Sequence, residues 1–157
     1  MQEDKLKSKL VKNLQEGEIL EHIKKWDLKN ASPDDRLLIS KLSSEESQRL
    51  QKEFNFKGNY ELVRQIDAQH IAHTLAQHGD EISEASRGQE AISLKDIAGY
   101  ENIIKSADTR ELRGKRIIYK KQINGHFVVV EEALTGKNRL GFVTMWKSKG
   151  KIKPPTS

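Results

Sequence analysis

Three of the five histidines of this chain lie within nine residues, at positions 70, 73 and 78. Histidine can both accept and donate a proton near neutral pH, so such a cluster could supply acid–base catalysis. On an ideal helix His70 and His73 share a face, whereas His73 and His78 are separated by about 140°. His73 and His78 can therefore converge only if the helix ends near Gln77, so that His78 turns outward beside Gly79.

The same residues allow a second interpretation, a metal site formed by His70 and His73 with Asp67 behind them. This set lacks the His-Glu-x-x-His pattern and an evident third ligand. We therefore favour acid–base chemistry, with His73 as the strongest single residue and His78 as its partner or positioning residue. His70 is more typical of a solvated surface histidine. His78 could equally be a histidine that ends a helix, where the helix dipole favours a positive charge.

Positive charge is concentrated in the last third of the chain. Residues 110–157 contain twelve Lys and Arg residues and three Glu residues, a net charge of +9, whereas residues 1–109 carry −4. Such a division is typical of proteins that bind a polyanion. A solvated basic face with a lysine-rich tail would give the same pattern, so charge alone leaves both interpretations open.

The composition excludes several classes of protein. With 35% hydrophobic and 32% charged residues, the chain has no apolar run that approaches the length of a transmembrane helix. Its first residues are charged and lack the apolar core of a secretory signal. The absence of cysteine excludes a disulfide framework, a thiolate zinc site and a cysteine nucleophile. We therefore expect no membrane association and a cytoplasmic location.

Several predicted helices must position these histidines. The histidine helix begins at about Glu61 or Asp67 and ends at Gln77, with Gly79 as its C-terminal stop. Four further helices are predicted from apolar spacing and capping residues. They cover residues 5–25, residues 33–41 after Ser32 and Pro33, the stretch from a capping box at 43–46 to about 53, and a stretch from Ser93 to about 106.

Three β-strands are predicted after the helices. Residues 116–121 and 126–131 are rich in β-branched side chains, and Asn124-Gly125 between them is a strong hairpin signal. A second turn at 135–138 leads to a strand over 139–147, on which alternation places Phe142, Thr144 and Trp146 on one face. Helices first and an antiparallel meander last predict an α+β fold. We divide the chain into a helical N-terminal arm or linker (1–57), an α+β domain (58–148) and a basic disordered tail (149–157).

Within residues 58–148, short motifs follow one another in an order that resembles a known family. It is a phage-associated nuclease family grouped with barnase, EndoU, the tRNA-cleaving colicins and RelE, and it occurs as the C-terminal, toxin-like domain of phage head-morphogenesis proteins. Trp146 replaces the family's usual tyrosine, and Leu75-Ala76-Gln77 replaces a stretch with basic residues. The motifs are Ile66-Asp67, Ile71-Ala72-His73, His78-Gly79-Asp80, Glu84, Arg87-Gly88-Gln89, Ile92, Asp96-Ile97, Ile103-Ile104, Asp108, Tyr119-Lys120-Lys121, Asn124-Gly125, Val129-Val130-Glu131-Glu132 and Thr144-Met145-Trp146-Lys147.

The resemblance implies a metal-independent ribonuclease or RNase-like toxin, with helices packed on a four-stranded antiparallel sheet as in barnase and RelE. It implies no cofactor. Its partners would be RNA, with tRNA among the candidates, and an immunity or antitoxin protein. The protein would act in the cytoplasm, or in the cytoplasm of a target cell into which it is delivered. The alternative is a non-catalytic nucleic-acid-binding accessory protein of a phage or mobile element.

Metal-free RNA cleavage uses the substrate's own 2′-hydroxyl as nucleophile, so the protein must supply a base, an acid and donors for the phosphorane charge. We expect His73 and His78 as the acid–base pair. Thr144 would donate a hydrogen bond to the phosphate, and Trp146 would stack on a base unless it packs in the core. The remaining candidates are basic or amide side chains: Lys121 in the catalytic group, and Arg87, Gln89, Arg116, Arg139 and Lys147 as substrate contacts.

Overall fold

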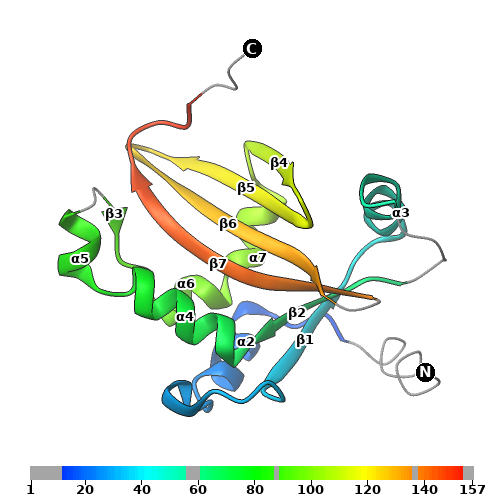
Figure 1. Cartoon of the computed structure of the whole chain (residues 1–157), viewed down its shortest axis with the longest axis horizontal. Coiled ribbons are helices and arrows are strands. Elements are labelled where there is room, and N and C mark those ends of the chain that lie inside the picture. Colours follow the sequence, from blue (N-terminus) through cyan, green and yellow to red (C-terminus); the bar gives the residue numbers. More distant parts are fainter. Residues whose placement is uncertain (1–11, 56–60, 87–88, 136–137, 154–157) are drawn as a thin grey trace.

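A computed structural model describes residues 12–55, 61–86, 89–135 and 138–153 of the chain (Figure 1). Helices and one seven-stranded sheet form an α+β architecture, which confirms the predicted fold class. No helix among these residues is long and apolar enough to cross a membrane. The elements are α2 (Glu16–Ile23), η1 (Leu28–Asn30), β1 (Arg36–Lys41), α3 (Ser44–Glu53), β2 (Val63–Asp67), α4 (Ala68–His78), α5 (Glu81–Ser86), β3 (Gln89–Glu90), α6 (Leu94–Ala98), α7 (Tyr100–Lys105), β4 (Thr109–Arg113), β5 (Arg116–Ile123), β6 (His126–Thr135) and β7 (Arg139–Lys149).

The sheet has the strand order β1-β2-β7-β6-β5-β4, and the short β3 pairs with the far end of β7. Strands β4 to β7 form the antiparallel meander, with Asn124 at φ 56° in the predicted hairpin turn. The pair β1–β2 joins the meander through a parallel contact between β2 and β7. Strands from both halves of the chain therefore build one mixed sheet.

The helix predicted over residues 33–41 is wrong. Ser32 accepts a bond from the Asp34 N–H in a turn, but residues 36–41 then form β1 and pair with β2, with Leu37 opposite Ile66. The pairing partner lies almost thirty residues further along the chain, so the local cap signal is overridden by a non-local contact.

Three other helices begin or end differently from the prediction. Of the helix predicted over 5–25, residues 16–23 form α2, whereas residues 12–15 are not helical, and the Leu14 N–H donates to the Ile39 carbonyl of β1 at 2.8 Å; residues 1–11 lie outside the described part. Asp67, one of the two predicted starts, is the N-cap of the histidine helix, which ends at His78, one residue beyond the predicted Gln77. The helix predicted from Ser93 is divided into α6 and α7 at Gly99, whereas α3 follows its predicted cap at Ser43.

A β-bulge in β7 changes which side chains face the core. Glu131 pairs with Thr144, but Glu132 pairs with Phe142, so Val143 is an extra residue on β7. The expectation that Phe142 shares a face with Thr144 and Trp146 is therefore wrong. Phe142 is fully buried against Tyr100, with ring centroids 5.0 Å apart.

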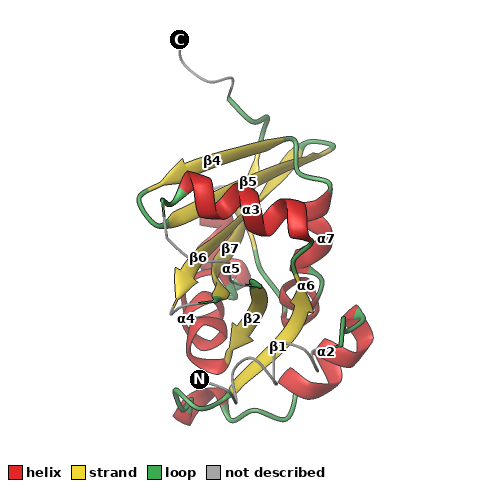
Figure 2. Cartoon of the chain, turned by 90° about the vertical axis from the view of Figure 1, so that its right-hand side faces the viewer, coloured by secondary structure: helices red, strands yellow, loops and turns green. Residues whose placement is uncertain are grey.

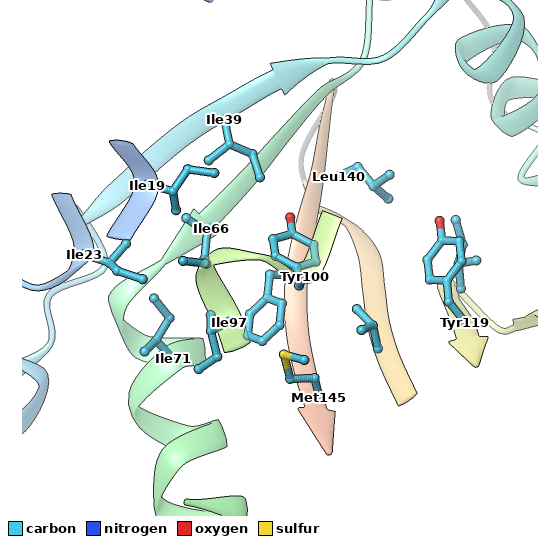
Figure 3. Close-up of a cluster of buried hydrophobic side chains, with 14 of the residues drawn as sticks. Ile19, Ile23, Ile39, Ile66, Ile71, Ile97, Tyr100, Tyr119, Leu140 and Met145 are labelled. Carbon is cyan, nitrogen blue, oxygen red and sulfur yellow. The ribbon is translucent and has the colours of Figure 1, made fainter. Parts of the chain in front are cut away.

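The hydrophobic core lies on the face of the sheet that carries Phe142 and Met145, where α2, α6 and α7 pack against the strands (Figures 2 and 3). Ile19 and Ile23 of α2 and Ile39 of β1 belong to this core. The boundary expected at residue 57 stays a prediction, although core contacts and the sheet cross it. The predicted tail covers residues 149–157, but Lys149 is the last residue of β7. The described residues end at 153.

A buried polar network interrupts the core. Arg64 of β2 donates to both carboxylate oxygens of Glu132, through Nε at 2.7 Å and Nη2 at 3.2 Å. The hydroxyls of Tyr119 and Tyr100 donate to the same carboxylate. Burial raises the pKa of Glu132, while Arg64 and the Tyr119 hydroxyl oppose that rise. Arg64 also contacts Glu101 at 3.3 Å, so every charge of the network has a partner.

Candidate functional site

The predicted histidine helix lies along β7, and together they enclose one side of a cavity of about 490 Å³. Strands β5 and β6 supply the other side. The cavity combines three histidines with a carboxylate, a guanidinium, a hydroxyl and an indole, which is the mixture that acid–base chemistry on a charged substrate requires. Its lining residues are Gln69, His70, His73, Gln77, His78, Arg116, Glu131, Val143, Thr144 and Trp146.

Helix α4 presents the histidines to this cavity because its opposite face is buried. Asp67 is the N-cap and accepts a bond from the His70 N–H, and Gly79 follows as the C-cap. Ile71 is fully buried in the core, and Thr74 is buried against β7. His73 is exposed at the mouth of the cavity. The helix includes His78 as its last residue, one position beyond the predicted end at Gln77, and both His73 and His78 line the cavity.

His70 is half-buried and bonded to Asp67, whereas the sequence predicted a solvated surface histidine. Its Nδ1 lies 2.7 Å from Asp67 Oδ2, and its side chain is 42% exposed. The hydrogen bond to Asp67 raises the pKa of the imidazole, while burial and the nearby Arg116 guanidinium lower it. The aspartate therefore orients the ring and favours its protonated form.

His78 forms part of the wall of the cavity. Its ring stacks on the Trp146 indole, with centroids 5.6 Å apart and an angle of 27° between the planes. Its Nδ1 lies 3.3 Å from Oε2 of the buried Glu84. Trp146 lines the cavity, whereas Phe142 lies in the core.

Sequence reasoning missed the carboxylate of the site, Glu131. Its side chain is only 12% exposed, and its Oε1 accepts a hydrogen bond from Arg116 Nη1 at 3.1 Å. Opposite it on β7 is Thr144, whose hydroxyl accepts a bond from Thr74 at 3.3 Å. An acidic residue within a β-branched strand was the available signal, since charged side chains are rarely buried there without a role or a partner.

The structure brings five of the predicted site residues together around the cavity: His73, His78, Thr144, Arg116 and Trp146. Lys121 does not line it. Lys121 lies on the opposite face of β5 and donates to the Ser106 carbonyl at 3.4 Å.

The remaining predicted contacts lie elsewhere in the described structure. Arg139 begins β7 beside Val63, at the end of the strand farther from the histidines. Lys147 forms an ion pair with Asp96 at 3.2 Å, on the core side of the sheet. Gln89 pairs with β7 in β3, and no described residue donates to its buried Oε1. Arg87 lies outside the described residues.

A larger cavity of about 910 Å³ lies between α2, α3, α7 and the sheet, on the core side. Size alone would favour it as the functional site. Its lining contains no histidine, and its five cations are each paired with a carboxylate within 4 Å: Lys41 with Glu61, Arg49 with Glu53, Arg64 with Glu132, Lys105 with Glu101 and Arg110 with Glu53. The smaller cavity therefore has the better chemistry for a catalytic site.

Comparison with known proteins shows the family to which the chain belongs. A search of the curated proteins gave no match. Among solved structures, the chain is similar to the ribonuclease toxin BrnT of Brucella abortus, with 16% identity and a TM-score of 0.36 over 54% of this chain and 92% of that one. A family model described as "phage-Barnase-EndoU-ColicinE5/D-RelE like nuclease3" matches residues 40–154, and the chain therefore belongs to this family of nucleases.

Proposed function

We propose that the protein is a metal-independent endoribonuclease that cleaves single phosphodiester bonds of RNA in the cavity between α4 and β5–β7. One observation carries the proposal: Glu131, Arg116 and the histidine face of α4 line the same cavity. A carboxylate and an imidazole are the two groups that can exchange protons with the 2′-hydroxyl and the 5′-oxygen.

In this proposal Glu131 is the general base and His73 the general acid. Glu131 takes the proton of the 2′-hydroxyl, whose oxygen attacks the phosphorus. His73 gives a proton to the departing 5′-oxygen, and the product carries a 2′,3′-cyclic phosphate. Of the two roles expected for His78, acid–base partner or positioning residue, we assign the second: it holds Trp146 in position, because it is stacked on the indole and bonded to Glu84.

Arg116 and Thr144 would stabilise the phosphorane. Arg116 is half exposed beside Glu131, so its free N–H groups can reach an entering phosphate while one N–H stays on the carboxylate. The Thr144 hydroxyl accepts a hydrogen bond from the Thr74 hydroxyl. The hydrogen of the Thr144 hydroxyl is therefore available to a ligand in the cavity. His70 adds positive character at the same wall because Asp67 raises its pKa.

The test is cleavage of a single-stranded RNA in EDTA by the wild type and by Glu131→Gln, His73→Ala and Arg116→Ala. Each substitution should lower kcat at least a hundredfold, the usual contribution of a general acid or base. Lys121→Ala, on the opposite face of the sheet, is the matched control among basic residues and should retain activity. An oligonucleotide with a 2′-deoxy sugar at the cleavage site should not be cut.

Two outcomes would overturn the proposal. Cleavage that survives all three substitutions would place the chemistry elsewhere. Binding of RNA without cleavage under any condition would favour the non-catalytic accessory protein. The resemblance to toxic nucleases further implies that expression arrests growth, that Glu131→Gln relieves the arrest, and that an immunity or antitoxin protein blocks the cavity.

A further inference from the structure

A strip of the sheet next to the cavity has the chemistry of a nucleic-acid surface. Lys120 on β5, Val129 on β6 and Trp146 on β7 are cross-strand partners, so their side chains lie in one row on the same face. The next row toward the hairpin contains Phe127 between Gln122 and Ser148. Trp146 belongs both to this strip and to the cavity.

The strip continues directly from the proposed catalytic residues. Glu131 pairs with Thr144 in the row before Lys120 and Trp146, and rows on one face are two strand residues apart, about 6.7 Å. One row therefore corresponds to roughly one nucleotide of an extended strand. A substrate held at Glu131 would place its neighbouring nucleotides over Trp146 and then over Phe127.

The side chains of the strip suit an anionic, aromatic ligand. The Lys120 ammonium lies 6.0 Å from the centre of the Phe127 ring, and both side chains are partly exposed. Within the described part of the chain, no carboxylate lies within ion-pair distance of Lys120, unlike Arg116 beside Glu131. Val129, which lies between Lys120 and Trp146 in the same row, is apolar and only 1% exposed.

We propose that Lys120 and Phe127 form a subsite for the nucleotide one step beyond those that flank the scissile bond, so that the enzyme binds RNA as a single strand along β6 toward the hairpin. A base would replace the ammonium on the Phe127 ring, and Lys120 would move to the adjoining phosphate. The rings of Trp146 and Phe127 stack on any base, so the subsite favours unpaired RNA of little sequence preference. This inference rests on the proposed ribonuclease function.

The experiment compares two substrates, a dinucleotide with one phosphodiester bond and an unstructured eight-nucleotide RNA. Wild type should have the higher kcat/KM on the longer RNA. Phe127→Ala and Lys120→Ala should each lower kcat/KM on the longer RNA roughly tenfold, mainly through KM, and leave the dinucleotide rate unchanged. Phe127→Tyr keeps a ring and should behave as wild type, whereas Phe127→Leu keeps the apolar volume and should not. Lys149→Ala removes the same charge from the opposite face of β7 and is the control.

Binding of a labelled eight-nucleotide RNA, measured by fluorescence anisotropy with each protein, separates the two proposals. If wild type cleaves both RNAs and the Phe127 and Lys120 variants lose both activities equally, or neither, the subsite is refuted and the ribonuclease stands. If wild type cleaves nothing but its affinity for RNA falls about tenfold in these variants, the strip binds RNA and the ribonuclease is refuted. If wild type neither cleaves nor binds RNA, both proposals fail.

Discussion

Replacing Glu132 by glutamine should destabilise the protein more than any change on its surface. Glutamine has nearly the same shape, so packing is preserved, but it removes the charge that faces Arg64 and turns one oxygen into a donor. Arg64 has a side chain only 4% exposed and would keep Glu101 as its remaining carboxylate. Breaking a buried pair from one side costs about 3–5 kcal/mol, and the Glu101 contact places our expectation near the lower value.

A loss of about 3 kcal/mol corresponds to a fall in Tm of about 6–12 °C for a domain of this size. Urea unfolding at pH 7 and a thermal melt measure the two quantities independently. Glu111→Gln is the matched control, because the Arg113–Glu111 pair is 69% and 54% exposed and should contribute less than about 1 kcal/mol. If Glu132→Gln lowers the free energy of unfolding by no more than this control does, the buried network does not contribute the stability that we infer from its burial.

Two further predictions concern helix α4. Asp67→Asn keeps the N-cap oxygen but removes the charge that raises the pKa of His70, so it should destabilise by up to about 1 kcal/mol below pH 6.5. That difference should disappear as the pH rises through the raised pKa, and equal losses in urea unfolding at pH 5.5 and pH 8.5 would contradict it. Gly79→Ala would bring a Cβ atom to 2.5 Å from the Leu75 carbonyl oxygen and should cost about 1–3 kcal/mol, whereas Gly17→Ala, whose Cβ meets nothing within 4 Å, should be neutral or stabilising in thermal melts.

Features that depend on a few adjacent residues could be predicted from the sequence. The Ser43 hydroxyl accepts a hydrogen bond from the Glu46 N–H and so caps its helix, and Asn124 tolerates the positive φ of its turn. Both signals lie within a few adjacent residues. The end of α4 beside Gly79 belongs to the same class. For this reason the sequence could place His73 and His78 at the end of one helix, whereas Thr144 was expected beside them only through the family resemblance.

Features that depend on strand register could not be predicted. Residues 36–41 became a strand because β2 supplies their hydrogen-bond partners. Glu131 belongs to the site because β5 and β7 place Arg116 and Thr144 beside it, and no local motif encodes that alignment. Lys121 differs from Lys120 only by one step of alternation, which assigns it to the opposite face.

The extra residue Val143 has a consequence for how this chain can change in length. On one side of it, β7 inserts Phe142 into the core; on the other, it directs Thr144 and Trp146 into the cavity. Without that single residue β7 would alternate regularly and would still direct Phe142 to the core and Thr144 and Trp146 to the cavity, because Glu132 and Glu131 are consecutive on β6. We therefore expect loss of Val143 to remove the bulge and keep both faces, whereas loss of any other single residue inside β7 would move one half of the strand to the wrong faces.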